Sequence, residues 1–94
     1  MSPEDLRCIR ERVREVAERI QPLLAPVPGL ARRNAPAHVW LGIRERFGEE
    51  WRARAEPASV RRFVDWIERH PNADYDEWDE TPIIRQDSFT ERLF

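Results

Sequence analysis

An apolar seam near the start of the chain limits the fold more than any other feature. Its members recur three and four residues apart, the spacing that puts side chains on one narrow face of an α-helix packed lengthwise against a partner. The seam consists of Leu6, Ile9, Val13, Val16, Ile20 and Leu23. Ser2 and the proline after it mark a helix start, and Pro22 marks its end. The sequence therefore predicts a first helix over about residues 3–21.

Two more helices are marked by their start and stop signals. Asn34 can cap a helix that begins near Pro36, and Gly48 can take the positive φ typical of the residue just after a helix. A third helix begins near Pro57 and ends before His70, because the residue preceding a proline is disfavoured in the helical conformation. The predicted fold is therefore all-α, a small bundle of three main helices.

One apolar face of each helix should contribute to a shared core. The residues expected there are Leu6, Ile9, Val13, Val16, Ile20, Trp40, Ile43, Phe47, Val60, Phe63, Val64 and Ile67. Residues 22–33 form a proline-rich loop, and its aliphatic side chains predict an ordered cover over one end of the bundle. Trp40 and Trp66 should lie in or beside the core. Trp51 and Trp78 occur in polar surroundings, so they are expected to be partly exposed anchors.

Charge is divided unevenly along the chain. The 16 basic residues are all arginines, and with 18 acids they give a net charge of −2. Residues 1–70 hold 14 arginines and 11 acids, or +3, whereas residues 71–94 hold two arginines and seven acids, or −5. We therefore interpret residues 1–71 as a helical domain and residues 72–94 as an acidic, aromatic extension. A capping box at Ser88 predicts a short last helix over residues 89–94.

The motifs of common catalytic and metal sites are missing from the sequence. The absence of lysine excludes Schiff-base and P-loop chemistry. Cys8, His38 and His70 lack metal-ligand spacing, so neither a metal nor another cofactor is predicted. The acidic run also lacks the glycine and the final glutamate of a calcium loop. We expect no enzymatic activity, and we expect Cys8 to be a buried or half-buried packing thiol.

Composition also bears on location. A single cysteine cannot form an intrachain disulfide, which is typical of intracellular proteins. No apolar run approaches the ~20 residues that cross a bilayer. The first residues are acidic and lack the apolar stretch of a signal peptide. We therefore expect a cytoplasmic protein that does not bind membranes.

The acidic extension is the first candidate binding surface. Aromatic side chains set among carboxylates are typical of short recognition segments, and an acidic segment can bind a basic protein surface or imitate the phosphates of DNA. The residues concerned are Tyr75, Asp76, Glu77, Trp78, Asp79 and Glu80. The opposite charge of the body leaves a second interpretation open, in which the extension folds back on its own molecule.

The arginine-rich middle third is the second candidate surface. Arginines that contact phosphates and tryptophans that stack on bases are the usual components of a nucleic-acid interface. The arginines concerned are Arg44, Arg46, Arg52, Arg54, Arg61 and Arg62. Neighbouring glutamates cancel part of their field, so a salt-bridged surface and a protein-binding surface remain alternatives. The seam from Leu6 to Leu23 could also pack on a second copy and form a homodimer.

Residues 32–67 contain a helix that ends in a basic residue, phenylalanine and glycine, an aromatic shortly after it, and an aromatic–aliphatic pair near the end of the next helix. These residues are Arg46-Phe47-Gly48, Trp51 and Trp66-Ile67. In these features the segment resembles the small helical domain at the C-terminus of phage antirepressor proteins. The chain differs from the family in its long acidic connection and in having no N-terminal DNA-binding domain. The resemblance implies a phage- or plasmid-type protein that contacts a repressor or DNA-processing machinery, and it implies no catalytic residue.

Two functional expectations follow. The first is a non-enzymatic protein-interaction module of phage or mobile-element type, which inhibits or regulates a DNA-associated partner as an antirepressor, an anti-CRISPR protein or an antitoxin does. Its acidic aromatic extension and its helical surface would contact the basic surface of that partner. The alternative is a small nucleic-acid-binding protein that uses the arginine-rich middle third.

Overall fold

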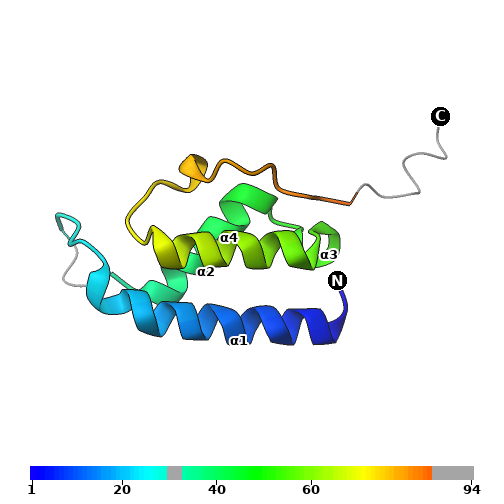
Figure 1. Cartoon of the computed structure of the whole chain (residues 1–94), viewed down its shortest axis with the longest axis horizontal. Helices are drawn as coiled ribbons and strands as arrows, with labels where there is room; N and C mark the ends of the chain where they lie inside the picture. The colour runs from blue at the N-terminus through cyan, green and yellow to red at the C-terminus, as the bar shows by residue number, and fades with distance from the viewer. Residues whose placement is uncertain (30–32, 86–94) are drawn as a thin grey trace.

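The computed structural model describes residues 1–29 and 33–85, and over these ranges it is built from helices (Figure 1). The elements in chain order are α1 (Pro3–Ile20), the 3-10 turn η1 (Gln21–Leu23), α2 (Ala35–Phe47), α3 (Trp51–Arg54), α4 (Pro57–Arg69) and the 3-10 turn η2 (Tyr75–Glu77). The three long helices are the three predicted ones, so the all-α bundle is confirmed. The short elements α3 and η2 were not predicted, because one turn is too short to show a helical period.

Local capping explains where the long helices begin and end. The Ser2 hydroxyl accepts a hydrogen bond from the Asp5 N–H (3.1 Å), and the Asp5 carboxylate accepts one from the Ser2 N–H (3.3 Å). At the start of α2, the Asn34 side chain accepts a bond from the Ala37 N–H (3.0 Å). Gly48 ends α2 with φ +90°, a value that side-chain-bearing residues rarely adopt. Three of the sequence signals therefore act as the pattern predicted.

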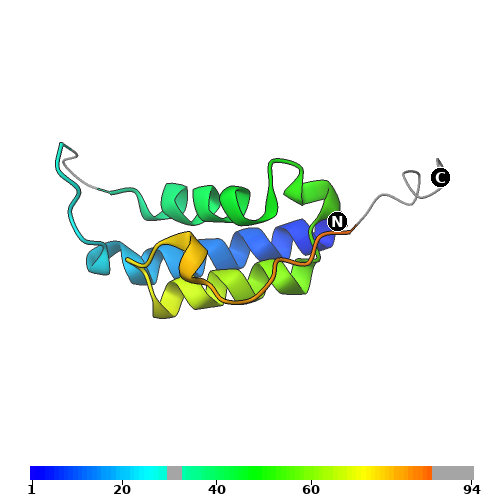
Figure 2. The ribbon, with the colours of Figure 1, turned by 90° about the horizontal axis from the view of Figure 1, so that it is seen from above.

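The bundle has α1 on one side and a long C-terminal segment on the other. Helix α1 packs against both α4 and α2. Residues 72–85, which we call the strap, run back along α4 on the side away from α1 (Figures 1 and 2). The strap ends beside α3, where an isolated antiparallel bridge joins Ala55 and Ile84. The acidic part of the chain is thus a layer of the fold.

The core largely follows the predicted set. Every predicted core residue is buried except Leu6 and Trp40, which are half-buried and pack against the core. The seam is used inside the chain, since its four central members are fully buried, whereas Leu23 at its end is 58% exposed. A homodimer through the seam stays a prediction. It would require either contacts through the less buried end residues, Leu6 and Leu23, or a rearrangement in which the central residues pack against a second copy instead of their own helices.

The burial of the four tryptophans differs in part from the prediction. Trp51 and Trp78 are 4% and 2% exposed, so the expectation that they are exposed anchors is wrong. Trp40 and Trp66, expected in or beside the core, are half-buried. Trp51 opens the short helix α3, where its ring stacks on that of Trp40 with centroids 5.9 Å apart. Its polar sequence neighbours point to solvent while its own ring faces α2, which a one-turn element does not reveal in the sequence.

An ion-pair cluster joins α1 to α4 at the edge of the core. Arg12 Nε lies 2.8 Å from Asp65 Oδ1, and Arg12 Nη2 lies 3.0 Å from Glu68 Oε1. Arg19 adds a bond of 2.8 Å to the other oxygen of Glu68. The bonds from Arg19 and then Arg12 lower the pKa of Glu68. The cluster links the two helices at the edge of the apolar core.

The described part of the proline-rich loop is fastened to the start of the strap. Asn72 Oδ1 accepts a bond from the Ala25 N–H (2.8 Å), and Asn72 Nδ2 donates one to the Leu23 carbonyl (2.9 Å). Leu24 packs against the core, whereas Val27 is 39% exposed. The predicted last helix over 89–94 lies outside the described residues. In the ranges that are described, no helix has the length and apolarity needed to cross a membrane.

Candidate functional site

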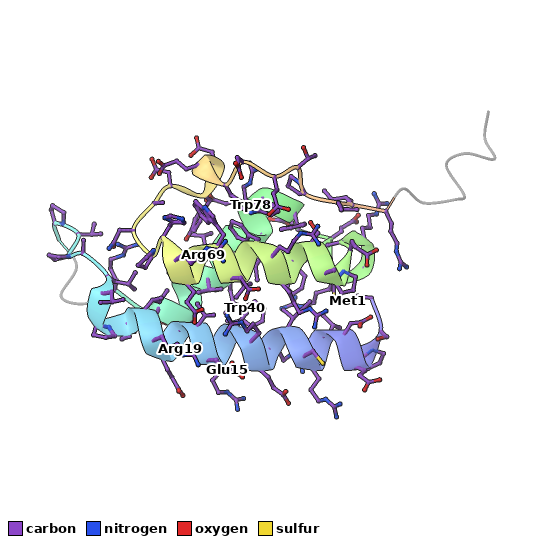
Figure 3. All side chains as sticks on the ribbon, viewed as in Figure 1. Met1, Glu15, Arg19, Trp40, Arg69 and Trp78 are labelled. Atoms are coloured by element: carbon purple, nitrogen blue, oxygen red, sulfur yellow. The ribbon has the colours of Figure 1, made fainter. Side chains whose placement is uncertain are left out.

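The strap turns its aromatic side chains toward the helices. Trp78, labelled in Figure 3, has its ring centroid 5.1 Å from that of Phe63 on α4 and 5.8 Å from that of Phe47 on α2. The guanidinium carbon of Arg46 lies 5.6 Å from the same indole ring. Trp78 is buried because two phenylalanines from separate helices form a site for it. The sequence of residues 74–80 contains no signal for a site formed by two distant phenylalanines. The prediction that the Trp78 indole is partly exposed is therefore wrong.

Tyr75 is the second inward anchor of the strap. A Cβ atom built on Gly42 of α2 would lie 2.6 Å from Tyr75 Cε1, so the phenol occupies space that any side chain at position 42 would take. Its hydroxyl donates a hydrogen bond to the His38 carbonyl (2.6 Å). Burial raises the pKa of Tyr75 to about 12. The phenol is therefore a neutral structural group at physiological pH.

His38 connects the strap to the proline-rich loop. Its Nε2 lies 3.0 Å from the Pro71 carbonyl, and its Nδ1 lies 3.2 Å from Arg33 Nη2. Burial lowers the pKa of His38, and the charge of Arg33 acts in the same direction. The contacts fit a neutral imidazole that donates from Nε2 to Pro71 and accepts at Nδ1 from Arg33. This role of His38 was not predicted from the sequence, although the four-residue spacing of His38 and Gly42 on α2 places both on one helical face.

Backbone and side-chain bonds hold the strap along its length. Arg46 Nη2 donates to the carbonyls of Trp78 (3.3 Å) and Glu80 (3.4 Å). Further on, the Ile83 N–H donates to the buried hydroxyl of Ser59 (3.1 Å), and the Ile83 carbonyl accepts from the Glu56 N–H (2.9 Å). The acidic segment thus lies on the arginine-bearing body of its own molecule. This agrees with the alternative in which the extension folds back on the helices. Whether it also binds a partner stays a prediction.

The carboxylates of the strap point away from the anchors. Asp74, Asp76, Glu77 and Asp79 are exposed. Glu80 forms an ion pair with Arg62 (3.0 Å), and Glu77 accepts a hydrogen bond from the Asp74 N–H (2.7 Å). Within the part of the chain that the structure describes, the three aspartates enter no ion pair. The strap therefore presents a row of exposed negative charges on a backbone that is held against the helices by its inward-facing side chains.

A groove of about 950 Å³ lies between the proline-rich loop, α2 and the strap. Two large apolar side chains in it are exposed, Val27 by 39% and Leu41 by 40%. Its acidic lining residues are Glu45 of α2 and two strap aspartates, Asp74 and Asp76. We call this the strap groove. Over its described lining, the strap groove combines apolar surface with excess negative charge.

The six predicted nucleic-acid-binding arginines do not form one surface. Arg54 pairs with Glu50 (3.1 Å), and Arg46 and Arg62 bind the strap. The others divide between two grooves: Arg44 and Arg52 line one beside Trp40, with the guanidinium of Arg52 5.0 Å from the Trp51 ring centroid, and Arg61 lines one between α1 and α4. Intramolecular hydrogen bonds and ion pairs therefore use three of the six arginines, and a cation–π contact uses a fourth, Arg52.

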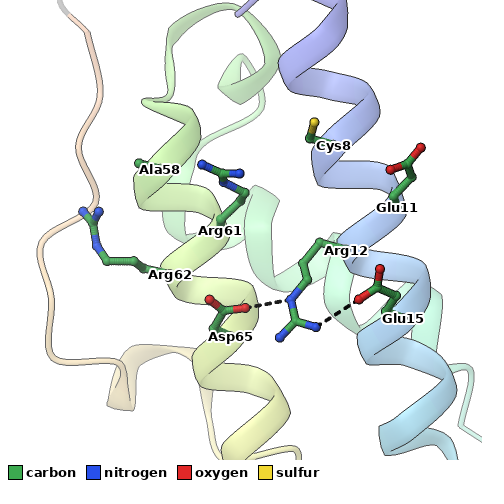
Figure 4. Close-up of a pocket in the computed structure, with 8 residues that line it drawn as sticks. All are labelled: Cys8, Glu11, Arg12, Glu15, Ala58, Arg61, Arg62 and Asp65. Atoms are coloured by element: carbon green, nitrogen blue, oxygen red, sulfur yellow. Dashed lines mark hydrogen bonds and ion pairs between the residues drawn. The ribbon is translucent and has the colours of Figure 1, made fainter.

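The groove between α1 and α4 contains the thiol (Figure 4). Cys8 is exposed there, so the expectation of a buried or half-buried packing thiol is wrong: the residue precedes seam residue Ile9 and faces the groove. Arg12 spans the groove between Asp65 (2.8 Å) and Glu15 (3.3 Å). In the described ranges, no three His, Cys, Asp or Glu side chains gather into a group that could hold a metal ion.

The chain matches no protein-family model, no curated protein and no solved structure. The resemblance of residues 32–67 to the antirepressor domain therefore stays a prediction. The contacts, charges and grooves of the chain itself carry the functional proposal.

Proposed function

We propose that this chain is a non-enzymatic protein-interaction module that binds a basic surface of a partner protein through the strap. One observation supports it above the others: Asp74, Asp76 and Asp79 are exposed on a backbone that Tyr75 and Trp78 anchor from beneath. Charges held in fixed positions lose little conformational freedom on binding, and they favour fast and selective association with the opposite charge. A loose acidic tail would lack that advantage.

The resemblance to phage antirepressor domains narrows the proposed partner to a DNA-associated protein. Such a partner has a basic surface for phosphates, and a fixed row of carboxylates can occupy that surface and exclude nucleic acid. The proposed role is therefore inhibition or regulation of a DNA-associated protein in the cytoplasm of a phage- or mobile-element host.

Charge reversal on the strap tests the proposal without unfolding the protein. The test variant is Asp76→Lys/Asp79→Lys, and the matched control is Glu11→Lys/Glu18→Lys, which reverses two exposed charges on α1. Immobilised full-length protein is incubated with nuclease-treated lysate of the source cell. We expect wild type and control to retain the same protein and the strap variant to lose it. Equal retention by the strap variant, or no retained protein at all, would overturn the proposal.

Removal of the whole extension is a poor version of this experiment. A chain that ends at residue 71 lacks Trp78, which is 2% exposed and contacts α2 and α4. Loss of binding by that truncation would therefore not separate a missing contact from a disturbed fold.

Nucleic-acid binding is the second candidate, and one observation favours it. Arg44 and Arg52 line a groove together with the half-buried Trp40, which combines cationic and aromatic side chains. A binder of this kind must lose affinity steeply as salt rises. An electrophoretic shift with single-stranded DNA at low salt, abolished by Arg44→Gln/Arg52→Gln, would support it. Absence of a shift at low salt removes it.

A further inference from the structure

We propose that the strap groove is the seat for a short partner segment in which one large apolar side chain is flanked by arginine or lysine. This inference rests on the proposed function, because it assigns the basic partner a place and a chemistry. It adds an apolar contact that the exposed carboxylates alone do not require.

The apolar part of the seat is formed by Val27 of the loop and Leu41 of α2. Both are exposed large hydrophobic residues, and they line the same groove. The other exposed large hydrophobics of the described chain, Leu23, Ile83 and Ile84, do not line it. Its volume of about 950 Å³ lies at the upper end of the range typical of small-ligand pockets, about 300–1,000 Å³. The groove therefore has room for a few side chains of a partner.

Charge selects a basic segment for this seat. Among the side chains that line the groove, Glu45, Asp74 and Asp76 are negative. Among the described residues that line it, Arg33 is the positive one, and its Nη1 already donates to the Ala25 carbonyl and to Asn72 Oδ1, both at 3.2 Å. An arginine or lysine of a partner would therefore meet carboxylates that have no ion-pair partner in the described ranges.

The surface on the other side of Leu41 carries an excess of positive charge. The neighbouring groove, which Leu41 also lines, contains Arg44 and Arg52 with one carboxylate, Glu49. A basic segment anchored on Leu41 would be repelled there and attracted toward the strap. The two grooves thus fix the side on which the flanking positive charges lie.

The groove between α1 and α4 shows why charge alone does not make a seat. Its arginines and carboxylates neutralise one another, with Arg12 bonded to both Asp65 and Glu15 (Figure 4). No exposed large hydrophobic residue lines it within the described chain. It therefore offers neither an apolar contact nor a net charge.

The walls of the strap groove are already ordered before binding. The Tyr75 hydroxyl binds the His38 carbonyl (2.6 Å), and the His38 ring contacts both Arg33 and Pro71. On the loop side, Asn72 binds the backbone at Ala25 (2.8 Å). A seat formed in advance costs less entropy on binding than one that must be assembled.

Three labelled peptides of about 12 residues test the seat by fluorescence anisotropy with the full chain. The first has one central leucine flanked by arginines among glycines and serines, the second has serine in place of the leucine, and the third has glutamates in place of the arginines. The variants are Leu41→Ser and, as matched control, Leu23→Ser, an exposed leucine (58%) that lies outside both the groove and the strap. Circular dichroism checks that both variants fold.

The leucine-arginine peptide is expected to bind wild type and Leu23→Ser equally and Leu41→Ser about tenfold more weakly. The serine peptide should bind all three proteins equally, and the glutamate peptide should bind none. Amide shifts caused by the first peptide should map to Val27, Leu41 and Tyr75. Equal affinity of Leu41→Ser, or shifts confined to another surface, would overturn the seat.

The outcomes separate this inference from the proposed function. If Asp76→Lys/Asp79→Lys abolishes peptide binding but Leu41→Ser does not change it, the strap binds basic partners and the seat is wrong. If neither arginine peptide binds wild type at any salt concentration, the seat is wrong, whereas retention of a partner from lysate would still support the proposed function.

Discussion

The seam of α1 and the strap both bury large side chains, and they do so in opposite ways. The seam distributes burial over Ile9, Val13, Val16 and Ile20, which recur with the helical period. The strap concentrates it in one residue, Trp78, inside a run of carboxylates. A periodic surface can be recognised from sequence and tolerates small changes at one position. An anchored segment shows no period, and its attachment depends on single residues.

The largest effect should come from the main anchor of the strap. Trp78→Ala removes an indole that is 2% exposed and should lower the free energy of unfolding by about 3–5 kcal/mol, as expected for a buried aromatic. Urea unfolding followed by circular dichroism measures it. Trp66→Ala, at a half-buried tryptophan, should cost clearly less. An unchanged midpoint for Trp78→Ala would mean that the strap is not part of the core.

The site that buries Trp78 can be tested by changing Phe47, its partner on α2. Phe47→Ala should also cost about 3–5 kcal/mol, because Phe47 is 3% exposed. The Phe47 and Trp78 rings lie 5.8 Å apart, so the double variant should lose less than the sum of the single losses. Additive losses in the same unfolding experiment would show that the two side chains stabilise the fold independently.

A smaller effect is expected where the second anchor meets α2. Gly42→Ala should destabilise the protein by about 1–3 kcal/mol through overpacking, although alanine in a helix is favoured over glycine by about 1 kcal/mol. The cause is the 2.6 Å approach of a Cβ at position 42 to the Tyr75 ring. In a Tyr75→Ala background the loss should be smaller, because the remaining close contact of that Cβ is Phe63 Cε2 at 3.2 Å. If Gly42→Ala is neutral or stabilising in wild type, the strap does not lie closely on α2.

The ion-pair cluster beside the seam should contribute less than either anchor. Arg12→Met removes bonds to Asp65 and Glu68 at a side chain that is 24% exposed, and about 1 kcal/mol of stability should be lost. Arg7→Met, which breaks an exposed pair with Glu4, should stay within about 0.5 kcal/mol. Equal effects of the two variants, measured by thermal and urea unfolding, would remove any special role of Arg12.

The smallest effect should be a pH dependence at the junction of loop and strap. Because burial lowers the pKa of His38 from 6.5, the unfolded chain binds the proton more readily than the folded protein. The stabilisation is therefore complete above about pH 6.5 and is lost as the pH falls through the lowered pKa of the folded state. In urea unfolding at each pH, His38→Gln should show a shallower loss of stability between pH 7.5 and 5.5 than wild type. Identical slopes for the two proteins would contradict the neutral state of His38 in the fold.

The bundle could be predicted from sequence because its signals are local. The 3-4 spacing of the seam, the caps at Ser2 and Asn34 and the stop at Gly48 act within a few residues of the chain. Each of these signals reflects either helical geometry or an unsatisfied backbone group at a helix end. None of them depends on a distant segment of the chain. This is why the three long helices begin and end within a residue of their predicted limits.

The placement of the strap depends on groups that lie far apart in the sequence. Trp78 is buried because Phe47 and Phe63 meet there, and Tyr75 fits because Gly42 has no side chain. Composition shows that an acidic aromatic segment follows a basic body, but opposite charge alone does not say which side chains turn inward. Those partners come together only when the helices pack, so the inward aromatics and the outward carboxylates are properties of the assembled fold.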